Sequence, residues 1–406
     1  MTPHAEPIPS RADDRTTIRV RFQKIITIAF GIALVAGLTG PRLAHAGDVP
    51  RFEVDASWPK PLPNNWIIGQ VGGITVDSQG HIWIIQRPRS LTDDEKGASL
   101  TPPRSKCCVA APPVIEFDAD GNMLRAWGGP GPGYEWVGRE HGIEVDDKGF
   151  VWIGGNADND NAILKFTADG KFVAQIGKIA PSKGSNDTTQ LGKPAETAID
   201  EAARELYVAD GYGNKRVAVI DADTGKFKRY WGAYGNKPDD ANLGVYNPNA
   251  PPAQQFRTPV HCAVVSNDRI VYVCDRVNDR LQSFTTDGKF LKEVRISPNT
   301  LGDGSTWDIA FSKDPQQKFM YLADGHDEKV WILDRESMEV LTSFGTGGKQ
   351  PGQFYAVHSI DTDSKGNIYT TETYDGRRVQ RFLYKGMQTI AKGTDQGTVW
   401  PRTSTN

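Results

Sequence analysis

Three histidines begin matching segments of this chain. His141 opens HGIEVDDKGFVWIGGN, His261 opens HCAVVSNDRIVYVCDR and His358 opens HSIDTDSKGNIYTTET. Each segment is an alternating apolar run, a turn rich in Asp, Gly, Lys or Asn, and a second apolar run, which is typical of a β-hairpin. Because imidazole both binds metals and transfers protons, the three residues could form one chemical centre if the fold brings them together.

The same two-strand pattern occurs at three further places. These copies begin at Gly72, Ala195 and Trp307 and read GGITVDSQGHIWIIQR, AETAIDEAARELYVADG and WDIAFSKDPQQKFMYLADG. A second hairpin follows most copies, as in AILKFTADGKFVAQIG, where the D-G-K turn favours a tight reversal. One unit is therefore four antiparallel strands of about 40 residues, and six units fill residues 70–385. A four-stranded unit repeated at this period predicts the blade of a β-propeller.

The sixth unit has no clear fourth strand of its own. The segment RFEVDASW, residues 51–58, precedes the first unit and can supply that strand, closing the ring and protecting its edges. We therefore predict an all-β protein with one six-bladed β-propeller over residues 47–406, closed by an N-terminal strand. Two stacked β domains are disfavoured because no linker interrupts the repeat. Insertions at 88–112 and 233–258 are expected to form rim, lid or surface loops.

Residues 1–46 differ in composition from the rest. A basic stretch with Arg15 and Lys24 precedes IITIAFGIALVAGLTG, and the small residues Ala44 and Ala46 follow. This order is that of a secretory signal peptide. An uncleaved membrane anchor is the alternative, but an apolar run of about 16 residues that contains glycines is short for a span. We predict cleavage near Gly47 and a periplasmic or secreted protein without membrane attachment.

The charge of the chain argues against polyanionic partners. The formal net charge is −3 and 24% of the residues are charged, so we expect neither nucleic acid nor an anionic membrane as a partner. The 42 glycines and 26 prolines suit a fold with many turns. We expect the protein to be a monomer.

Four cysteines remain for an exported protein, in which disulfides are permitted. Cys262 and Cys274 lie nearly opposite each other on one predicted hairpin, so a cross-strand bridge depends on the register. Cys107 and Cys108 are adjacent in the first insertion and are either a vicinal disulfide or two thiols. The two pairs are not spaced as a four-cysteine zinc site.

Histidine occupies the first aligned position in units two, four and six only. In a propeller the innermost strand of each blade lines the axis, and alternate blades of a six-fold ring lie about 120° apart around it. The three imidazoles would then point inward at one level, as a three-histidine metal site with one open position requires. One histidine alone would more often be a satisfied core residue. Neutral imidazoles favour zinc, with copper or iron as lesser options, acting as a Lewis acid.

Antiparallel strand order places the residues after each second strand on the same face as the histidines. These rim residues are Arg87, Asn156, Tyr212, Arg276, His326 and Tyr374, with Asp210, Asp275, Asp324 and Glu372 just before them. The arginines suggest a substrate with a carboxylate, and a tyrosine can act as general acid or base. The alternative is that the acids cap turns and pair with arginines. The expected partner is a small-molecule or peptide substrate.

Four segments resemble the lyase half of peptidylglycine α-amidating enzymes, within the NHL-repeat propellers. They are HGIEVDDKGFVW, YVADGYGNKRV, CDRVNDRLQSF and VHSI, with IIQR beside them, and the resemblance spans residues 65–385. It implies a zinc ion held by His141, His261 and His358. It also implies that Tyr212 is the base on the substrate hydroxyl, while Arg276 and Arg87 hold the carboxylate and stabilise charge. The implied reaction cleaves a peptidyl-α-hydroxyglycine, a carbinolamide, to an amide and glyoxylate.

The chain departs from this family at several positions. Ala356 and Val357 replace Met-Pro before the last histidine, and Ser359 replaces an aspartate that helps to bind a structural calcium. Calcium is therefore a weaker expectation than zinc. Gly213 replaces a cysteine, so the family's disulfide at that place is lost. No segment resembles the copper monooxygenase that makes the hydroxyglycine, so the chemistry could be kept with a different substrate.

Two other classes of function remain open at this point. A metal-dependent hydrolase of the lactonase type could use the same fold, although the gluconolactonase type has a carboxylate-rich calcium site rather than a histidine-rich ring. A non-catalytic NHL propeller that binds protein or glycan through its rim is the other alternative. Bound metal separates the enzymes from the scaffold, because a scaffold has no need for three axial histidines.

Overall fold

A computed structural model describes residues 46–401 of the protein. The predicted signal peptide, residues 1–46, lies outside the described residues except for Ala46. Within the described part, no helix is both long enough and apolar enough to cross a membrane.

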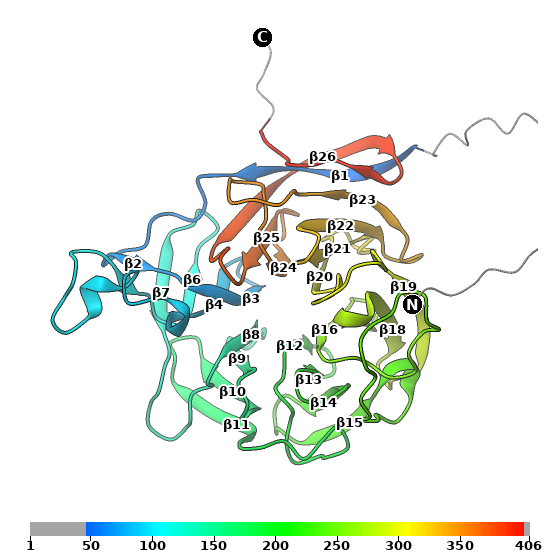
Figure 1. The fold of residues 1–406 in the computed structure, drawn as a ribbon, viewed down its shortest axis with the longest axis horizontal. Helices are drawn as coiled ribbons and strands as arrows, with labels where there is room; N and C mark the ends of the chain where they lie inside the picture. The colour runs from blue at the N-terminus through cyan, green and yellow to red at the C-terminus, as the bar shows by residue number, and fades with distance from the viewer. Residues whose placement is uncertain (1–45, 402–406) are drawn as a thin grey trace, which may run out of the picture. The chain divides into compact units, whose positions relative to one another are not determined.

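Six antiparallel sheets are arranged around a central axis, as Figure 1 shows. The first strand of each repeat lies innermost, and the innermost strands of neighbouring sheets contact one another around the ring. The six-bladed β-propeller predicted from the repeat is confirmed. The first three blades consist of β3 (Gln70–Val76), β4 (Ile82–Arg87), β6 (Val114–Phe117) and β7 (Met123–Trp127); β8 (Glu140–Val145), β9 (Phe150–Gly155), β10 (Asp160–Thr167) and β11 (Phe172–Ile179); and β12 (Glu196–Asp200), β13 (Glu205–Asp210), β14 (Arg216–Asp221) and β15 (Phe227–Trp231).

The other three blades continue the same order. Their strands are β16 (Val260–Val265), β17 (Ile270–Asp275), β18 (Arg280–Thr285) and β19 (Phe290–Arg295); β20 (Asp308–Phe311), β21 (Phe319–Asp324), β22 (Lys329–Asp334) and β23 (Val340–Phe344); and β24 (Val357–Thr362), β25 (Ile368–Glu372), β26 (Val379–Ala391) and β1 (Ala46–Asp55). A short strand, β27 (Thr394–Asp395), adds to β23 in parallel. The repeat pattern did not predict β27.

The N-terminal strand closes the ring, as predicted. β1 pairs antiparallel with β26, and Val54 lies opposite Phe382. The predicted strand 51–58 was placed too far along the chain. β1 ends at Asp55 because that carboxylate accepts a hydrogen bond from the Ser57 amide (3.0 Å) and starts a turn. The pairing extends in the other direction to Ala46, opposite Ala391.

Apolar side chains between adjacent blades form the core. Between blades three and four, Tyr207 and Val219 pack with Val271 and Phe284, and all four are fully buried. A buried side chain of this size contributes about 1.5–3 kcal/mol relative to an exposed one. The alternation of apolar residues along each strand therefore places one face of every blade against its neighbour.

A turn aspartate stabilises the inner hairpin of several blades. In blade two, Asp146 accepts hydrogen bonds from the amides of Lys148 (3.1 Å) and Phe150 (2.9 Å) and from the Trp152 indole (3.2 Å). Asp77 of blade one accepts from the indole six residues later in the same way (2.9 Å). The acidic turns of the repeat are thus local folding signals.

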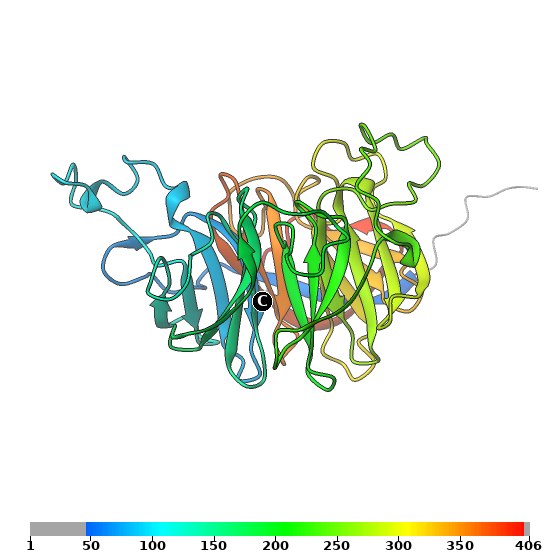
Figure 2. The same cartoon turned by 90° about the horizontal axis from the view of Figure 1, so that it is seen from below.

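Both insertions rise from the same face of the propeller, as Figure 2 shows. The first connects β4 to β6 and contains the 3-10 helices η1 (Pro88–Ser90) and η2 (Gly97–Ser99) and the strand β5 (Val109–Ala110), which pairs with β2 (Trp66–Ile67). The second connects β15 to β16 and contains η3 (Ala233–Gly235). Cys107 and Cys108 of the first insertion form a disulfide.

Candidate functional site

The three histidines lie at β-bulges of the innermost strands. In β8, β16 and β24 the pairing with the second strand shifts by one residue, between Glu140 and Ile143, between Val260 and Cys262, and between Val357 and Ile360. β3 of blade one shifts in the same way between Val71 and Gly73, whereas β12 and β20 pair without a shift. A bulge turns a side chain away from the regular pleat. Each histidine thus lies at a bulge, while the bulge of blade one has Gly72 at the matching position.

The imidazoles meet on the propeller axis. One ring nitrogen each of His141, His261 and His358 lies within 4.8 Å of the other two. The ring centroids are 4.7–5.0 Å apart. All three side chains are buried, with 1–3% of their surface exposed. The structure therefore brings together the three histidines that the repeat singled out.

Backbone carbonyls fix the orientation of two rings. Nδ1 of His141 lies 2.7 Å from the Ala195 carbonyl oxygen, and Nδ1 of His261 lies 2.6 Å from that of Trp307. A carbonyl only accepts, so each Nδ1 carries the proton and each Nε2 keeps a lone pair. Nδ1 of His358 is buried and has no hydrogen-bond partner within residues 46–401. An imidazole whose second nitrogen is held by a carbonyl is the usual form of a metal ligand.

The electrostatic surroundings keep the imidazoles neutral. Burial lowers the pKa of each of the three histidines well below its usual range. Neighbouring positive charge lowers these pKa values further: Arg276 acts on His261, and Arg87 also acts on His141. Neutral imidazole is the protonation state that binds a metal ion.

Tyr212 lies directly beside the histidine nitrogens. Its hydroxyl oxygen is 3.0 Å from Nε2 of His141 and 3.2 Å from Nε2 of His261. The residue before it must be small, because a Cβ at Gly211 would lie 1.9 Å from the Val260 carbonyl oxygen. Gly211 therefore lets this loop of blade three approach the strand of blade four that carries His261.

Arg276 connects Tyr212 to the rim. Its Nη1 donates to the Tyr212 hydroxyl oxygen (3.2 Å), and its guanidinium lies over the Trp307 ring, 4.5 Å from the centroid. Nη2 is 3.3 Å from a carboxylate oxygen of Asp303. Nε is buried and has no partner in the described part of the chain. The N–H group at Nε of Arg276 is thus left without an acceptor among the described residues.

Arg87 is also buried beside the histidines. Its Nε donates to the Glu140 carbonyl (2.7 Å), and its Nη1 donates to Gln70 (2.9 Å) and Thr373 (3.1 Å). Burial and the charge of Arg139 lower the pKa of Arg87 to about 10, so it stays protonated at neutral pH. It is a fixed positive charge close to the three imidazoles.

The acids before the rim residues stabilise turns. Asp210 accepts from Arg216 (2.8 Å) and Asn214 (2.8 Å), and Asp275 accepts in the same pattern from Arg280 (2.7 Å) and Asn278 (2.8 Å). The remaining acids behave alike: Asp324 accepts from the amides of His326 and Asp327, and Glu372 pairs with Arg378. Asp210 and Asp275 therefore stabilise the connections that carry Tyr212 and Arg276.

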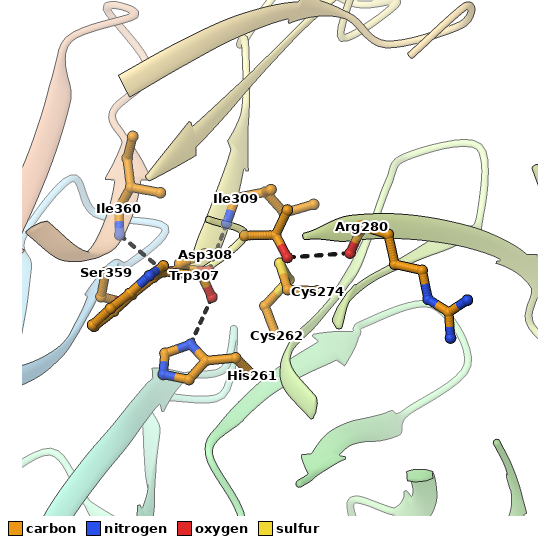
Figure 3. Close-up of a disulfide and its surroundings, with 10 residues drawn as sticks. His261, Cys262, Cys274, Arg280, Trp307, Asp308, Ile309, Ser359 and Ile360 are labelled. Atoms are coloured by element: carbon orange, nitrogen blue, oxygen red, sulfur yellow. Dashed lines mark hydrogen bonds between the residues drawn. A yellow bond between two sulfur atoms is a disulfide. The ribbon is translucent and has the colours of Figure 1, made fainter. Parts of the chain in front are cut away.

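Cys262 and Cys274 form a disulfide beside the site, as Figure 3 shows. The two residues are register partners, and their Cα atoms are 4.8 Å apart. The bridge therefore joins the strand that begins at His261 to the strand that leads into Arg276. The predicted cross-strand bridge depended on the hairpin register, and the observed register places Cys262 directly opposite Cys274.

Buried carboxylates lie next to the histidines on the axis. A small cavity bounded by the three imidazoles is also lined by Glu196, Asp308 and Ser359. Asp308 accepts from the Ser359 hydroxyl (2.7 Å) and from the Ile360 amide (2.9 Å), which Figure 3 shows. Burial raises the pKa of both carboxyl groups. The sequence carried a signal for this pair, since both acids occupy the second aligned position of their units.

The roles of three other residues near the site were not predicted from the sequence. The carbonyls that hold His141 and His261 belong to Ala195 and Trp307, which are the first aligned positions of units three and five. Asp303 stands in a G-D-G stretch between blades four and five. Nothing in the repeat marked Asp303, because connections between blades follow no register.

Two further groups of metal-ligating side chains occur among the described residues, and both are satisfied otherwise. In the first, His81 contacts Glu116 (2.8 Å), which pairs with Arg125, while Trp83 donates to Asp77. In the second, the sulfur is that of Cys262, which the disulfide occupies. The histidine triad is therefore the group whose donor atoms fit a transition metal.

The residues at this site fit zinc, but they do not fit calcium, the second metal that the resemblance implies. For zinc, three neutral imidazoles with converging nitrogens are the donor set of a catalytic site. For calcium, the aspartate of the family pattern is Ser359, and its hydroxyl donates to Asp308 instead. The residues at this place do not match the calcium pattern, and we assign no role to calcium.

Comparisons with known proteins agree with the fold. No protein-family model matches the chain. NHL repeat-containing protein 3 of Mus musculus is 24% identical over 365 residues, which cover 85% of this chain and 87% of that protein. A probable peptidyl-alpha-hydroxyglycine alpha-amidating lyase of Caenorhabditis elegans is 26% identical, over 65% of this chain and 69% of that protein.

The chain is a homologue of the NHL-repeat propellers. Peptidylglycine alpha-amidating monooxygenase of Rattus norvegicus is also 24% identical, over 75% of this chain but only 30% of the rat protein. A solved structure from Bacteroides thetaiotaomicron, of unknown function, has 16% identity and a TM-score of 0.51 over 84% of this chain and 77% of its own. The relatives thus include a probable amidating lyase, an amidating monooxygenase and an NHL repeat-containing protein at similar levels of identity.

Proposed function

We propose that this NHL-repeat propeller is a zinc-dependent lyase that cleaves the C–N bond of a carbinolamide, such as a peptidyl-α-hydroxyglycine, to an amide and glyoxylate. The observation that carries the proposal is the position of the Tyr212 hydroxyl, 3.0 and 3.2 Å from two histidine nitrogens and within reach of Arg276. A satisfied structural triad would have no need for a tyrosine at that place.

The chain's own residues account for the proton transfers. When bound to the three histidines, zinc supplies a Lewis acid for the substrate oxygen. The Tyr212 oxygen acts as the base that takes the proton of the substrate hydroxyl, and Nη1 of Arg276, 3.2 Å away, stabilises negative charge on that oxygen. The electron pair that the broken O–H bond leaves on oxygen then forms the C=O double bond of glyoxylate, and the C–N pair leaves on the amide nitrogen. Tyr212 then passes the proton to that nitrogen, which completes the amide.

The arginines explain why the substrate should carry a carboxylate. Arg87 and Arg276 are two buried guanidinium groups beside the histidines, and Nε of Arg276 is a buried donor without a partner in the described part of the chain. A charged donor next to a carboxylate forms a hydrogen bond about twice as strong as a neutral one. The carboxylate of a hydroxyglycine would be held there, with its hydroxyl toward Tyr212.

The reaction is tested by measuring glyoxylate and amide release from an acyl-α-hydroxyglycine. We expect zinc-loaded native protein to release both products in equal amounts. Tyr212→Phe should lower kcat by about 10²–10⁴-fold, the usual contribution of a positioned acid–base group, while it retains zinc. His261→Ala should lose both zinc and activity. Tyr230→Phe is the matched control, because Tyr230 lies on the outermost strand of blade three.

Two outcomes would contradict this proposal. Absence of glyoxylate from the native, zinc-loaded protein would exclude this substrate class. Full activity in Tyr212→Phe would show that the proton is moved by another group. Zinc that binds without any turnover would instead favour the hydrolase alternative, which hydrolysis of a lactone series would then test.

We also propose that the protein works in the periplasm or outside the cell. Two disulfides among the described residues are in keeping with an oxidising compartment. Fractionation of cells that express the full chain should recover the protein without its first residues, outside the cytoplasm. Recovery of the uncleaved chain in the cytoplasm would contradict this.

A further inference from the structure

The Arg276 guanidinium lies among residues from three connections between strands, which carry Asp303, Tyr374 and Tyr212. Asp303, in the connection from β19 to β20, lies 3.3 Å from Nη2 of Arg276 through one carboxylate oxygen. Its other carboxylate oxygen accepts a hydrogen bond from the Tyr374 hydroxyl (2.7 Å), which comes from the connection of β25 to β26. A continuous chain of contacts thus runs from Tyr374 through Asp303 and Arg276 to Tyr212.

The backbone is built to hold Asp303 at this place. It stands between Gly302 and Gly304, which both adopt left-handed φ angles, of 71° and 75°. A Cβ at Gly304 would lie 2.0 Å from the Arg276 carbonyl oxygen. Glycine at that position therefore allows the connection to lie directly against the backbone of Arg276, which brings the neighbouring carboxylate within reach of the guanidinium.

Tyr374 is also held in an uncommon conformation. Its φ angle is 45°, in the left-handed region that an aromatic residue rarely adopts. Its ring lies edge-on to Trp307, with 6.4 Å between centroids, while Trp307 packs against the guanidinium. Residues kept in such conformations often serve a site rather than the fold.

The contact between Asp303 and Arg276 is a weak one. It joins single atoms at 3.3 Å rather than two parallel pairs, and the Asp303 side chain is 43% exposed. Exposed ion pairs contribute little, because water and salt screen them. A ligand carboxylate that also contacts the second arginine could replace Asp303, since the substrate would then be held by two guanidinium groups.

We propose that Asp303 and Tyr374 form a latch on Arg276 that a substrate carboxylate must displace, and that this latch selects substrates with a carboxylate next to the reacting carbon. The proposal rests on the lyase function proposed above. In the free protein Asp303 occupies Nη2 of Arg276 and is held there by Tyr374. A substrate carboxylate takes that position, and Asp303 moves toward solvent. A neutral substrate cannot release the latch, because it offers nothing in exchange for the ion pair.

The test is calorimetric titration of the zinc-loaded full chain with N-benzoylglycine, which lacks the α-hydroxyl and cannot be cleaved, and with its neutral amide. Asp303→Asn removes the competing charge and should lower the Kd of the acid by about threefold to fivefold. Tyr374→Phe frees Asp303 from its anchor and should lower that Kd by a smaller factor. The Kd of the neutral amide should stay unchanged in both variants.

Asp375→Asn is the matched control for charge. Asp375 follows Tyr374 on the same loop and pairs with Arg377 (3.7 Å) rather than with Arg276. Its removal subtracts the same charge and should leave the Kd of the acid unchanged. An unchanged or higher Kd in Asp303→Asn would overturn the latch, because Asp303 would then orient Arg276 instead of competing for it.

The two proposals fail in different ways. If native protein releases no glyoxylate but Asp303→Asn still tightens the acid, the reaction is wrong and the latch stands. If glyoxylate is released and the titrations of native protein and Asp303→Asn coincide, the latch is wrong and the reaction stands. Absence of any binding of the acid to either protein would overturn the latch.

Discussion

Individual residues at the centre of this propeller have chemically consistent protonation states. The carbonyls of Ala195 and Trp307 fix the protons of His141 and His261 on Nδ1, and burial keeps both rings neutral. The Nε2 lone pairs therefore face Tyr212 and the axis. These features follow from carbonyl positions in neighbouring blades, so no sequence pattern could reveal them, whereas the histidines themselves were predicted from their common register.

Asp279 allows a prediction at the level of one residue, away from the histidines. Burial raises the pKa of this carboxyl to about 7, and one of its oxygens has no partner within the described residues. The folded state then holds a proton that the unfolded state has lost above pH 4, so native stability falls as the pH rises from 5 to 8. Asp279→Asn should remove this contribution. Between pH 5 and pH 8 the melting temperature of the variant should therefore fall by about 1–3 °C less than that of the native protein.

Thermal unfolding of both proteins at several pH values measures this difference. The substitution suits the backbone, because Asp279 has a φ of 51° and asparagine tolerates the left-handed region. Parallel pH profiles for the native protein and the variant would show that Asp279 titrates normally in the folded state.

Among the elements, the bulges explain how a regular repeat produces an irregular site. β8, β16 and β24 carry an extra residue at the histidine, β3 carries one at Gly72, and β12 and β20 keep regular pairing. Alternation and turn residues predicted the inner hairpin of every blade. They could not predict the bulges, because one inserted residue leaves the apolar pattern of the rest of the strand intact. The end of β1 was also misplaced, since a turn at Asp55 stops it early.

The disulfide of blade four offers a prediction for this element. It closes a loop between residues 12 positions apart, so its removal in Cys262→Ala with Cys274→Ala should lower the free energy of unfolding by about 2–4 kcal/mol. Chemical denaturation without reductant measures the loss.

The second disulfide serves as the control. Cys107 and Cys108 are adjacent, so their bridge closes almost no loop in the unfolded chain. Replacing both with alanine should cost far less than the change in blade four. Equal losses for the two double variants would show that loop closure is not the source of the stabilisation.

For the whole molecule, the period of two blades links the fold to the proposed function. Histidine occurs in blades two, four and six, while the carbonyls of blades three and five hold two of the rings. Three blades thus supply the histidines, and two of the blades between them hold a ring in place. The repeat allowed this arrangement to be predicted, because a closed ring turns equal sequence spacing into equal angles. The connections between blades follow no such rule, and Asp303 was therefore found only in the structure. Tyr374 was predicted at the rim, but its hydrogen bond to Asp303 was not.

The central claim is that the three histidines hold a transition metal, and the metal content of purified protein tests it most directly. We expect about one equivalent of tightly bound metal per chain, zinc above all, as for a three-histidine catalytic site. Each single change among His141→Ala, His261→Ala and His358→Ala should remove it, while His326→Ala, an exposed histidine outside the triad, should retain it. Less than about half an equivalent in native protein, with none retained after zinc addition, would contradict the account.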